Sequence, residues 1–384
     1  MVTIWVRLRL MVAILCALLA LHVVVLIDTR LNWQFTLLAT EYGHRIAIPA
    51  LVLACTGTFL RGRDAHAGTA LLFGSALVLL IPVWQMGNIT RRLPAEMQAA
   101  FGERATRGVH RMSLTSLWLG LGKPAVKRIE EFVYAKPEKN DPLRIHFFRA
   151  EQRVAAPCII VIHGGGWENG SATEFSNWSA SWASQGYAVA CVEYRLAPRH
   201  QWPAPREDMR QALAWLKAHA DELDIDATRF VLLGRSAGGQ IASASAVDLR
   251  DPAIRGCIAI YAPHDMMFAR RFAFESDVLN SLRLLRNYLG GDPEEAAENY
   301  RGASAFSTAD SHLCPTLLLH GTRDTFVWNM QSRRFAQRLG KLGVAHQLIE
   351  LPWAVHGFDW PYDGPSGQIT REAIDGFLHA VAAD

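Results

Sequence analysis

Residues 230–239 read Phe-Val-Leu-Leu-Gly-Arg-Ser-Ala-Gly-Gly, a short apolar run that ends in a glycine-rich turn around Ser236. The apolar run predicts a buried strand, and the small residues after it predict a helix. In such a unit the flanking Gly234 and Gly238 are needed, because a side chain there would clash where the two backbones approach. Ser236 is therefore a candidate nucleophile, although the five-residue pattern alone fits a purely structural turn equally well.

A second glycine-rich turn, His163-Gly-Gly-Gly-Trp167, follows the apolar run 158–162. Its consecutive glycines expose backbone N–H groups, which together with the N–H of Ala237 can bind the oxyanion of a tetrahedral intermediate. A phosphate-binding loop is the competing interpretation. It fits less well, because the turn has neither the lysine and Ser/Thr of a Walker loop nor the GxGxxG spacing.

His356 and Asp324 are candidates for the base and the acid that a serine nucleophile needs. His356 lies in the loop after the last apolar run, and Asp324 follows the run before it. A neutral imidazole can take the serine proton and return it to the leaving group, while a buried carboxylate fixes the tautomer of the imidazole. The chain order serine, aspartate, histidine supports this interpretation. Asp265 remains an alternative acid, whereas Asp359 lies too close to His356 in sequence.

Strands and helices alternate in the second part of the chain. The predicted strands cover residues 129–134, 143–148, 158–163, 187–194, 230–234, 256–261, 316–320 and 346–351. The predicted helices cover residues 206–219, 237–246, 331–341 and 369–381. Several strands are continuous apolar runs, which is typical of strands covered on both faces. The alternation predicts an α/β fold with a mostly parallel eight-stranded sheet and helices on both faces, preceded by an antiparallel hairpin.

Three motifs give the chain from Ile129 onward a resemblance to the α/β-hydrolase family. The motifs are His163-Gly-Gly-Gly-Trp167, Tyr194-Arg-Leu-Ala-Pro198 and Gly234-Arg-Ser-Ala-Gly-Gly239. Together they resemble the carboxylesterase and hormone-sensitive-lipase-like branch of that family. The resemblance does not extend to residues 1–90.

The resemblance also implies roles for individual residues. It implies a catalytic triad of Ser236, Asp324 and His356. It implies an oxyanion hole formed by the N–H groups of Gly165, Gly166 and Ala237. No metal or organic cofactor is expected, since these groups are sufficient for acyl transfer.

The sequence thus predicts a serine esterase that hydrolyses carboxylic esters through an acyl-enzyme intermediate. One alternative is a lipase or a prenylcysteine-methylesterase-like hydrolase of membrane-derived esters. Another is a catalytically inactive binding protein on the same fold, which is disfavoured because all three triad candidates are present. The insertion 263–313 carries many apolar residues and either caps the site or forms ordinary surface helices.

The first 90 residues are more apolar and predict a membrane-anchored region. Apolar runs near 10–27, 46–60 and 67–86 predict three transmembrane helices, of which the middle one is short enough to be re-entrant. A cleaved signal peptide competes for the first run, but that run continues past Ala20 without a small-residue cleavage site. The predicted division is 1–90 transmembrane region, 91–126 linker or interfacial helix, and 127–384 α/β-hydrolase catalytic domain.

The charged residues and the cysteines indicate the orientation in the membrane and argue against nucleic acid and zinc as partners. Arg7, Arg9, Arg61 and Arg63 favour a cytoplasmic N-terminus, so three crossings would place the catalytic domain on the non-cytoplasmic side, although the other loops carry nearly as many arginines. The formal net charge is only +3, and no basic run is interleaved with aromatics, which argues against nucleic acid as a partner. The six cysteines stand singly in apolar runs, a pattern unlike a zinc site.

Overall fold

An eight-stranded sheet organises the C-terminal part of the chain. The computed structural model describes residues 2–26, 29–107, 112–120, 124–126, 129–138, 141–151 and 155–383. Within these ranges the strands lie in the order β1-β2-β4-β3-β5-β6-β7-β8. β2 pairs antiparallel with both β1 and β4, and the remaining pairs are parallel. The predicted fold class, a mostly parallel sheet preceded by an antiparallel hairpin, is confirmed.

Each strand overlaps one of the apolar runs that predict it. The strands are β1 (Glu130–Glu138), β2 (Asp141–Phe148), β3 (Ala156–Ile162), β4 (Ala188–Val192), β5 (Ile225–Arg235), β6 (Ile254–Ile260), β7 (Thr316–Gly321) and β8 (His346–Leu351). We refer to this sheet and the helices that follow β1 as the sheet domain.

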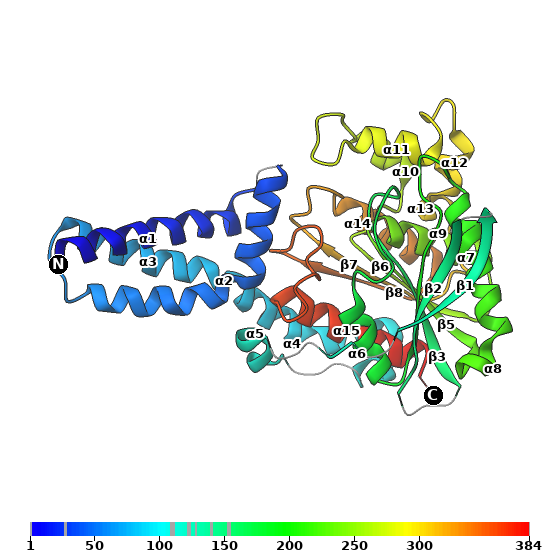
Figure 1. Cartoon of the computed structure of the whole chain (residues 1–384), viewed down its shortest axis with the longest axis horizontal. Helices are drawn as coiled ribbons and strands as arrows, with labels where there is room; N and C mark the ends of the chain where they lie inside the picture. Colours follow the sequence, from blue (N-terminus) through cyan, green and yellow to red (C-terminus); the bar gives the residue numbers. More distant parts are fainter. Residues whose placement is uncertain are drawn as a thin grey trace.

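Helices cover both faces of the sheet and bury its apolar side chains (Figure 1). One face is covered by α7 (Ala204–Ala218), α8 (Ala220–Leu223), α9 (Ala237–Leu249) and α14 (Met330–Leu342). The other face is covered by α6 (Ser176–Ser184) and α15 (Pro365–Val381). Neighbouring residues of β3 point to opposite faces, so that Ile160 joins the first core and Ile159 the second. Burial on both faces explains why the strands are continuous apolar runs.

Four short helices lie between β6 and β7, in the insertion that sequence analysis singles out (Figure 1). They are α10 (Met266–Arg271), α11 (Ser281–Leu289), α12 (Ala297–Gly302) and α13 (Ala305–Thr308). Met266, Leu285 and Tyr288 are buried in the core that contains α9. The insertion is therefore packed onto the sheet domain rather than projecting from it.

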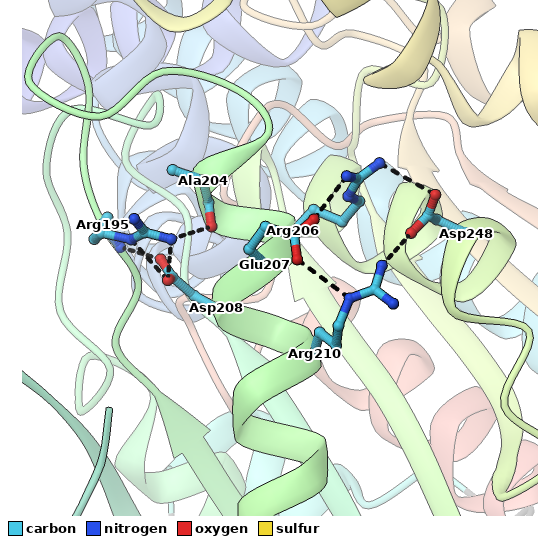
Figure 2. A network of polar contacts seen from close by, with 7 residues as sticks. All are labelled: Arg195, Ala204, Arg206, Glu207, Asp208, Arg210 and Asp248. Atoms are coloured by element: carbon cyan, nitrogen blue, oxygen red, sulfur yellow. Dashed lines mark hydrogen bonds and ion pairs between the residues drawn. The ribbon is translucent and has the colours of Figure 1, made fainter. Parts of the chain in front are cut away.

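Helix α7 is tied on two sides by arginines. Arg195, in the Tyr-Arg-Leu-Ala-Pro motif, donates from Nε to the buried carboxylate of Asp208 at 2.7 Å (Figure 2). On the other side, Arg206 and Arg210 of α7 both donate to Asp248 of α9, at 3.1 and 2.9 Å. The network holds α9, which begins directly after the candidate nucleophile, in a fixed position relative to α7.

Helix α4 (Ile81–Phe101) packs on the sheet, which corrects the predicted division near residue 90. Its buried face, with Leu93 at the centre, enters the core between the sheet and α15. The third predicted span is therefore divided between α3 (Arg63–Leu79) and the start of α4. Pro82 lies in the first turn of α4, where a missing N–H costs nothing.

Helices α1 (Val2–Val24), α3 and the second part of α2 (Arg30–Gly57) form a bundle that extends away from the sheet domain (Figure 1). Small side chains such as Ala13, Ala47 and Ala76 fill its interior. Large apolar side chains cover its outside, including Ile4, Met11, Leu15, Val52 and Leu77. An apolar outer surface of this extent marks a contact with lipid or with another protein.

The helix ends differ from the predicted spans. Two stretches of the described residues are long and apolar enough to cross a membrane, Thr3–Val24 and Arg63–Phe101, and the second of these comprises α3 and α4. Helix α2 begins well before the predicted span 46–60, because its polar side chains are buried against the rest of the protein. It also changes direction (Figure 1), which Pro49 explains because proline cannot donate the i to i−4 hydrogen bond.

The predicted linker or interfacial helix, residues 91–126, packs on the sheet domain where it is described. After α4 come η1 (Glu103–Thr106) and α5 (Leu114–Leu119), and Leu117 of α5 is buried in the core that contains α15. Residues 108–111 and 121–123 of this stretch lie outside the described residues, as does residue 27 at the end of the first predicted span.

Candidate active site

Ser236 lies in a tight turn between β5 and α9, as the glycine pattern predicts. Its backbone angles are φ 54° and ψ −121°, a region that L-residues rarely adopt. A Cβ on Gly234 would lie 2.1 Å from the carbonyl oxygen of Gly238, and a Cβ on Gly238 would lie 2.2 Å from that of Ile162. Only glycine fits at both places, so the turn is held in the strained form that presents the serine at the end of its strand.

The structure brings Ser236, His356 and Asp324 together from three separate loops. The Nε2 atom of His356 is 2.9 Å from Oγ of Ser236, and its Nδ1 atom is 2.7 Å from Oδ2 of Asp324. With its proton on Nδ1, a neutral imidazole donates to Asp324 and accepts from the Ser236 hydroxyl. This is the hydrogen-bond arrangement that activates a serine for nucleophilic attack.

Asp324 is buried and is held by several donors. The backbone N–H groups of Phe326 and Val327 both donate to its Oδ1, each at 2.9 Å. Burial alone would raise the pKa of Asp324, but the neighbouring His356 and His320 outweigh burial and lower it to about 2. Asp324 therefore remains ionised in the native protein above about pH 4. It can hold the imidazole in one tautomer across the neutral range.

His320, at the end of β7, is a site residue that sequence analysis misses. It is buried, and its Nδ1 is 2.7 Å from the hydroxyl of Ser332, while its Nε2 is 2.9 Å from the carbonyl oxygen of Val327 and 3.5 Å from Oδ2 of Asp324. These contacts shape the loop that carries Asp324. The only sequence signal is the histidine itself, four residues before the aspartate.

The two other aspartates considered from the sequence have different partners. Asp265 caps α10 through the N–H of Phe268 and pairs with Arg334 at 2.8 Å. Asp359 is fully buried and accepts from Nε of Arg235 at 2.5 Å and from the hydroxyl of Tyr261 at 2.6 Å. Neither carboxylate is brought to His356 as Asp324 is. Asp359 instead fastens the loop that follows His356 to the turn that carries the nucleophile.

The predicted oxyanion donors surround Ser236. Gly165 and Gly166 have φ angles of 111° and 61°, and a Cβ on Gly165 would lie 2.0 Å from the carbonyl oxygen of Asn169. Both glycines line a cavity together with Ser236. Ala237 is the first residue of α9, so its N–H has no acceptor within the helix. The three residues predicted to donate therefore lie beside Ser236.

The glycine loop is tied to the insertion by a network that the sequence does not predict. Trp167 Nε1 and the hydroxyl of Tyr288 both donate to Oε1 of Gln240, at 2.9 and 2.8 Å, and Nε2 of Gln240 donates to the carbonyl of Ala303 at 2.8 Å. The rings of Trp167 and Tyr288 stack with their centroids 4.4 Å apart. Gln240 lies on α9, one turn after the nucleophile, and thus joins three parts of the site.

Two cavities meet at Ser236. The first, of about 240 Å³, lies under the insertion, and its lining includes Phe268, Phe272, Phe274, Leu285 and Trp328. The second, of about 490 Å³, lies on the side of His356, and its lining includes Glu174, Arg235, Arg283 and Trp360. The insertion thus shapes the site, as one of the two interpretations of its sequence expects. Trp360 lines this second cavity, whereas Trp353 lines neither cavity. Trp353 is buried, and its Nε1 donates to the hydroxyl of Ser366 at 2.9 Å.

Comparison with known proteins agrees with this description. The sheet and the serine, histidine and aspartate at its edge define an α/β-hydrolase-fold protein. The family model described as BD-FAE matches residues 145–339, just over half of the chain, so the chain belongs to the BD-FAE family. The matched part contains Ser236 and Asp324 but ends before His356. Within the described ranges, no group of three or more His, Cys, Asp or Glu side chains is arranged to hold a metal ion.

Curated relatives are similar to part of this chain. Esterase LipC of Mycobacterium tuberculosis is 30% identical over 243 residues, covering 59% of this chain and 59% of the relative. The probable carboxylic ester hydrolase LipM of the same organism is 28% identical over 244 residues, covering 59% and 55%. The chain therefore spans less than two thirds of the length of these relatives.

Two solved structures share the fold. The apo form of Thermogutta terrifontis esterase 2 is 26% identical with a TM-score of 0.55, covering 66% of this chain and 95% of that one. The acetyl ester-xyloside bifunctional hydrolase of Caldicellulosiruptor lactoaceticus is 22% identical with a TM-score of 0.56, covering 66% and 96%.

Proposed function

We propose that this protein is a membrane-anchored serine esterase that hydrolyses carboxylic esters through an acyl-enzyme intermediate. The observation that carries the proposal is the hydrogen-bond relay, 2.9 Å from Ser236 to His356 and 2.7 Å from His356 to Asp324. The names of the similar proteins, esterases and a carboxylic ester hydrolase, support the same reaction. Ser236 is the nucleophile, His356 the general base and acid, and Asp324 the group that orients the imidazole.

The reaction has two halves. Ser236 Oγ attacks the ester carbonyl carbon and passes its proton to Nε2 of His356, while the N–H groups of Gly165, Gly166 and Ala237 bind the oxyanion. The C–O bond to the alcohol breaks, and the alcohol oxygen takes the proton from His356. Water then attacks the acyl-enzyme with His356 as base, which releases the acid and restores the serine.

The N-terminal bundle is the proposed anchor. Its outer surface is apolar, and α1 lies in a stretch long enough to span a bilayer. The second such stretch, Arg63–Phe101, begins in the bundle with α3 and continues into α4. Figure 1 places the N-terminus at the end of the bundle far from the sheet domain, on the same side as the loop that precedes Arg63. Positive charge at that end favours a cytoplasmic N-terminus, which puts the sheet domain on the non-cytoplasmic side.

The test is hydrolysis of short-chain p-nitrophenyl esters by the detergent-solubilised protein and by Ser236→Ala, with fluorophosphonate labelling in parallel. We expect turnover and labelling in the native protein and loss of both in the variant. A folded native protein that neither labels nor hydrolyses any ester would contradict the proposal and favour a binding protein on the same fold.

A further inference from the structure

Helix α2, in the N-terminal region outside the family match, reaches the active site. The indole Nε1 of Trp33 donates to the backbone carbonyl oxygen of His356 at 2.8 Å. The ring of Trp33 lies 5.2 Å from that of Phe326, and Phe326 lies 5.4 Å from the imidazole of His356. Arg30 and Trp33 both line the second cavity beside Ser236. The anchor region therefore builds part of the wall of the site.

The two cavities at Ser236 can be assigned to the two halves of an ester. His356 lines only the second cavity, and its Nε2 must hand a proton to the oxygen of the leaving alcohol. The alcohol half consequently lies in the second cavity, beside α2. The acyl half then lies in the first cavity, whose walls under the insertion are mainly aromatic and aliphatic.

The linings of the two cavities suit different chemistry. The acyl side includes Phe268, Phe272 and Trp328, so it favours an apolar chain. The alcohol side includes Arg30, Glu168 and Glu174. Apolar residues such as Phe175 and Leu284 line it as well, so it can bind a polar group beside an apolar wall. An ester with one apolar and one polar half is an amphiphile, and amphiphiles concentrate at the surface of a bilayer.

The first part of α2 has an unusual distribution of polarity. Asn32, Thr36 and Thr40 are buried against the protein, whereas Leu31, Phe35 and Leu38 are 63%, 42% and 41% exposed. This is the reverse of a helix that faces water, and it suits a helix whose outer face contacts lipid. Exposed aromatic residues also stand at the cavity rims, including Phe272, Phe274, Trp328 and Trp360. Tryptophans, here Trp328 and Trp360, are enriched at membrane interfaces.

We infer that helix α2 forms the alcohol side of the active site, with Trp33 positioning His356 and Arg30 selecting the alcohol, and that the substrate is an amphiphilic ester drawn from the anchoring bilayer. Its acyl half is apolar and its alcohol half is polar. The inference rests on the proposed esterase function and adds a substrate class and a role for the N-terminal region.

The first test separates the alcohol side from the acyl side. The full-length protein is assayed with butyrate esters of glycerol and of hexanol, and with p-nitrophenyl esters of acetate, butyrate and octanoate. In Arg30→Ala and Trp33→Ala we expect the glycerol-to-hexanol ratio of kcat/KM to fall by about tenfold or more, with the acyl ranking unchanged. Phe272→Ala should change the order of activity on the acetate, butyrate and octanoate esters and leave the glycerol-to-hexanol ratio of kcat/KM unchanged. Trp84→Ala, on an exposed face of α4, is the matched control and should change neither.

Trp33→Phe separates positioning from folding. It keeps an aromatic ring and removes only the N–H that holds the His356 carbonyl, so we expect kcat to fall with KM and the alcohol ratio nearly unchanged. A loss of both kcat and the alcohol ratio in Trp33→Phe, or an acyl shift in Trp33→Ala, would overturn the assignment of the two sides.

The second test concerns the bilayer. The protein is reconstituted into phosphatidylcholine vesicles, and a monoacylglycerol is supplied either in the same vesicles or in separate ones. We expect at least about tenfold faster hydrolysis when enzyme and ester share a vesicle, since the local concentration is then far higher. Equal rates would overturn the bilayer part of the inference. Absence of any Ser236-dependent hydrolysis would instead defeat the esterase proposal itself.

Discussion

The two halves of the active site are built in different ways. The strand ends supply Ser236, Asp324 and His356, which are joined by short hydrogen bonds and surrounded by buried side chains. The segments laid over them are α10 with the residue that follows it, in the insertion, and α2 in the N-terminal region. They supply walls that include Phe272 and Trp33. In the proposed enzyme, the sheet thus fixes the chemistry, and helices that lie outside the sheet select the substrate.

The largest expected effect comes from breaking the chemical half. Asp324→Asn should lower kcat by about 10⁴-fold, because the amide no longer fixes the imidazole tautomer that accepts the serine proton. Steady-state kinetics with a p-nitrophenyl ester measure this. Asp265→Asn is the control, since Asp265 pairs with Arg334 and caps α10, and it should cost less than about tenfold. Similar losses in both variants would contradict the assignment of Asp324 as the orienting acid.

The second effect tests the frame that holds the chemical half. Asp359→Asn leaves the buried Arg235 guanidinium without its charged partner, which should cost about 3–5 kcal/mol of stability. We expect the melting temperature of the detergent-solubilised protein to fall by at least about 6 °C. Asp310→Asn breaks the ion pair with Arg250, in which the side chains are 61% and 37% exposed, and it should cost below about 1 kcal/mol. Equal melting temperatures of the two variants would show that the Arg235–Asp359 pair does not stabilise the fold.

The chemical half is the part that the sequence predicts well. Its strands are apolar runs. The backbone conformation of a tight turn requires Gly234, Gly238 and the glycines after His163. Each of these features can therefore be recognised from a short stretch of sequence, without knowing which residues lie next to it in space. The order of Ser236, Asp324 and His356 along the chain then places them at one edge of a parallel sheet. A short stretch of residues thus determines each feature of the chemical half.

The walls formed by the N-terminal helices cannot be predicted in the same way, because their contacts are with residues far away in the sequence. Trp33 and His356 are 323 residues apart, and nothing near Trp33 in sequence indicates that contact. The start of α2 is hidden for the same reason, since Thr36 and Glu41 look like surface residues until the sheet domain buries them. Likewise, Leu93 of α4 follows Arg91 and Arg92 in the predicted linker, and only the structure shows that it packs on the sheet.

A third prediction concerns the residue that joins the two halves. Gln240→Leu removes the acceptor of Trp167 and Tyr288 while keeping a similar volume, so the buried donors lose their partner. We expect kcat/KM to fall by about 10- to 100-fold, since each unsatisfied group costs roughly 1–3 kcal/mol. Ser245→Ala on the same helix is the control, because the buried Ser245 hydroxyl has no hydrogen-bond partner in the described residues. Activity retained in Gln240→Leu would show that the insertion and the glycine loop are not coupled through Gln240.

The last expected effect concerns a carboxylate buried on α15, on the face of the sheet opposite α9. Asp375 on α15 is buried with one unpaired oxygen, and burial raises its pKa to about 7, opposed by Arg371. Because this pKa lies above that of the unfolded chain, the native state binds the proton more tightly, and its stability declines as the pH rises from about 4 to 7. Asp375→Asn removes that decline, so relative to native protein it should gain up to about 2.5 kcal/mol between pH 5 and pH 8. Thermal melts at both pH values measure the gain. Asp226→Asn is the control, since Asp226 pairs with Arg229 and its lowered pKa leaves it ionised in both states over this range, and it should show no comparable change with pH. A pH-independent difference in Asp375→Asn would mean that Asp375 is already ionised at pH 5 and that its charge is balanced within the fold.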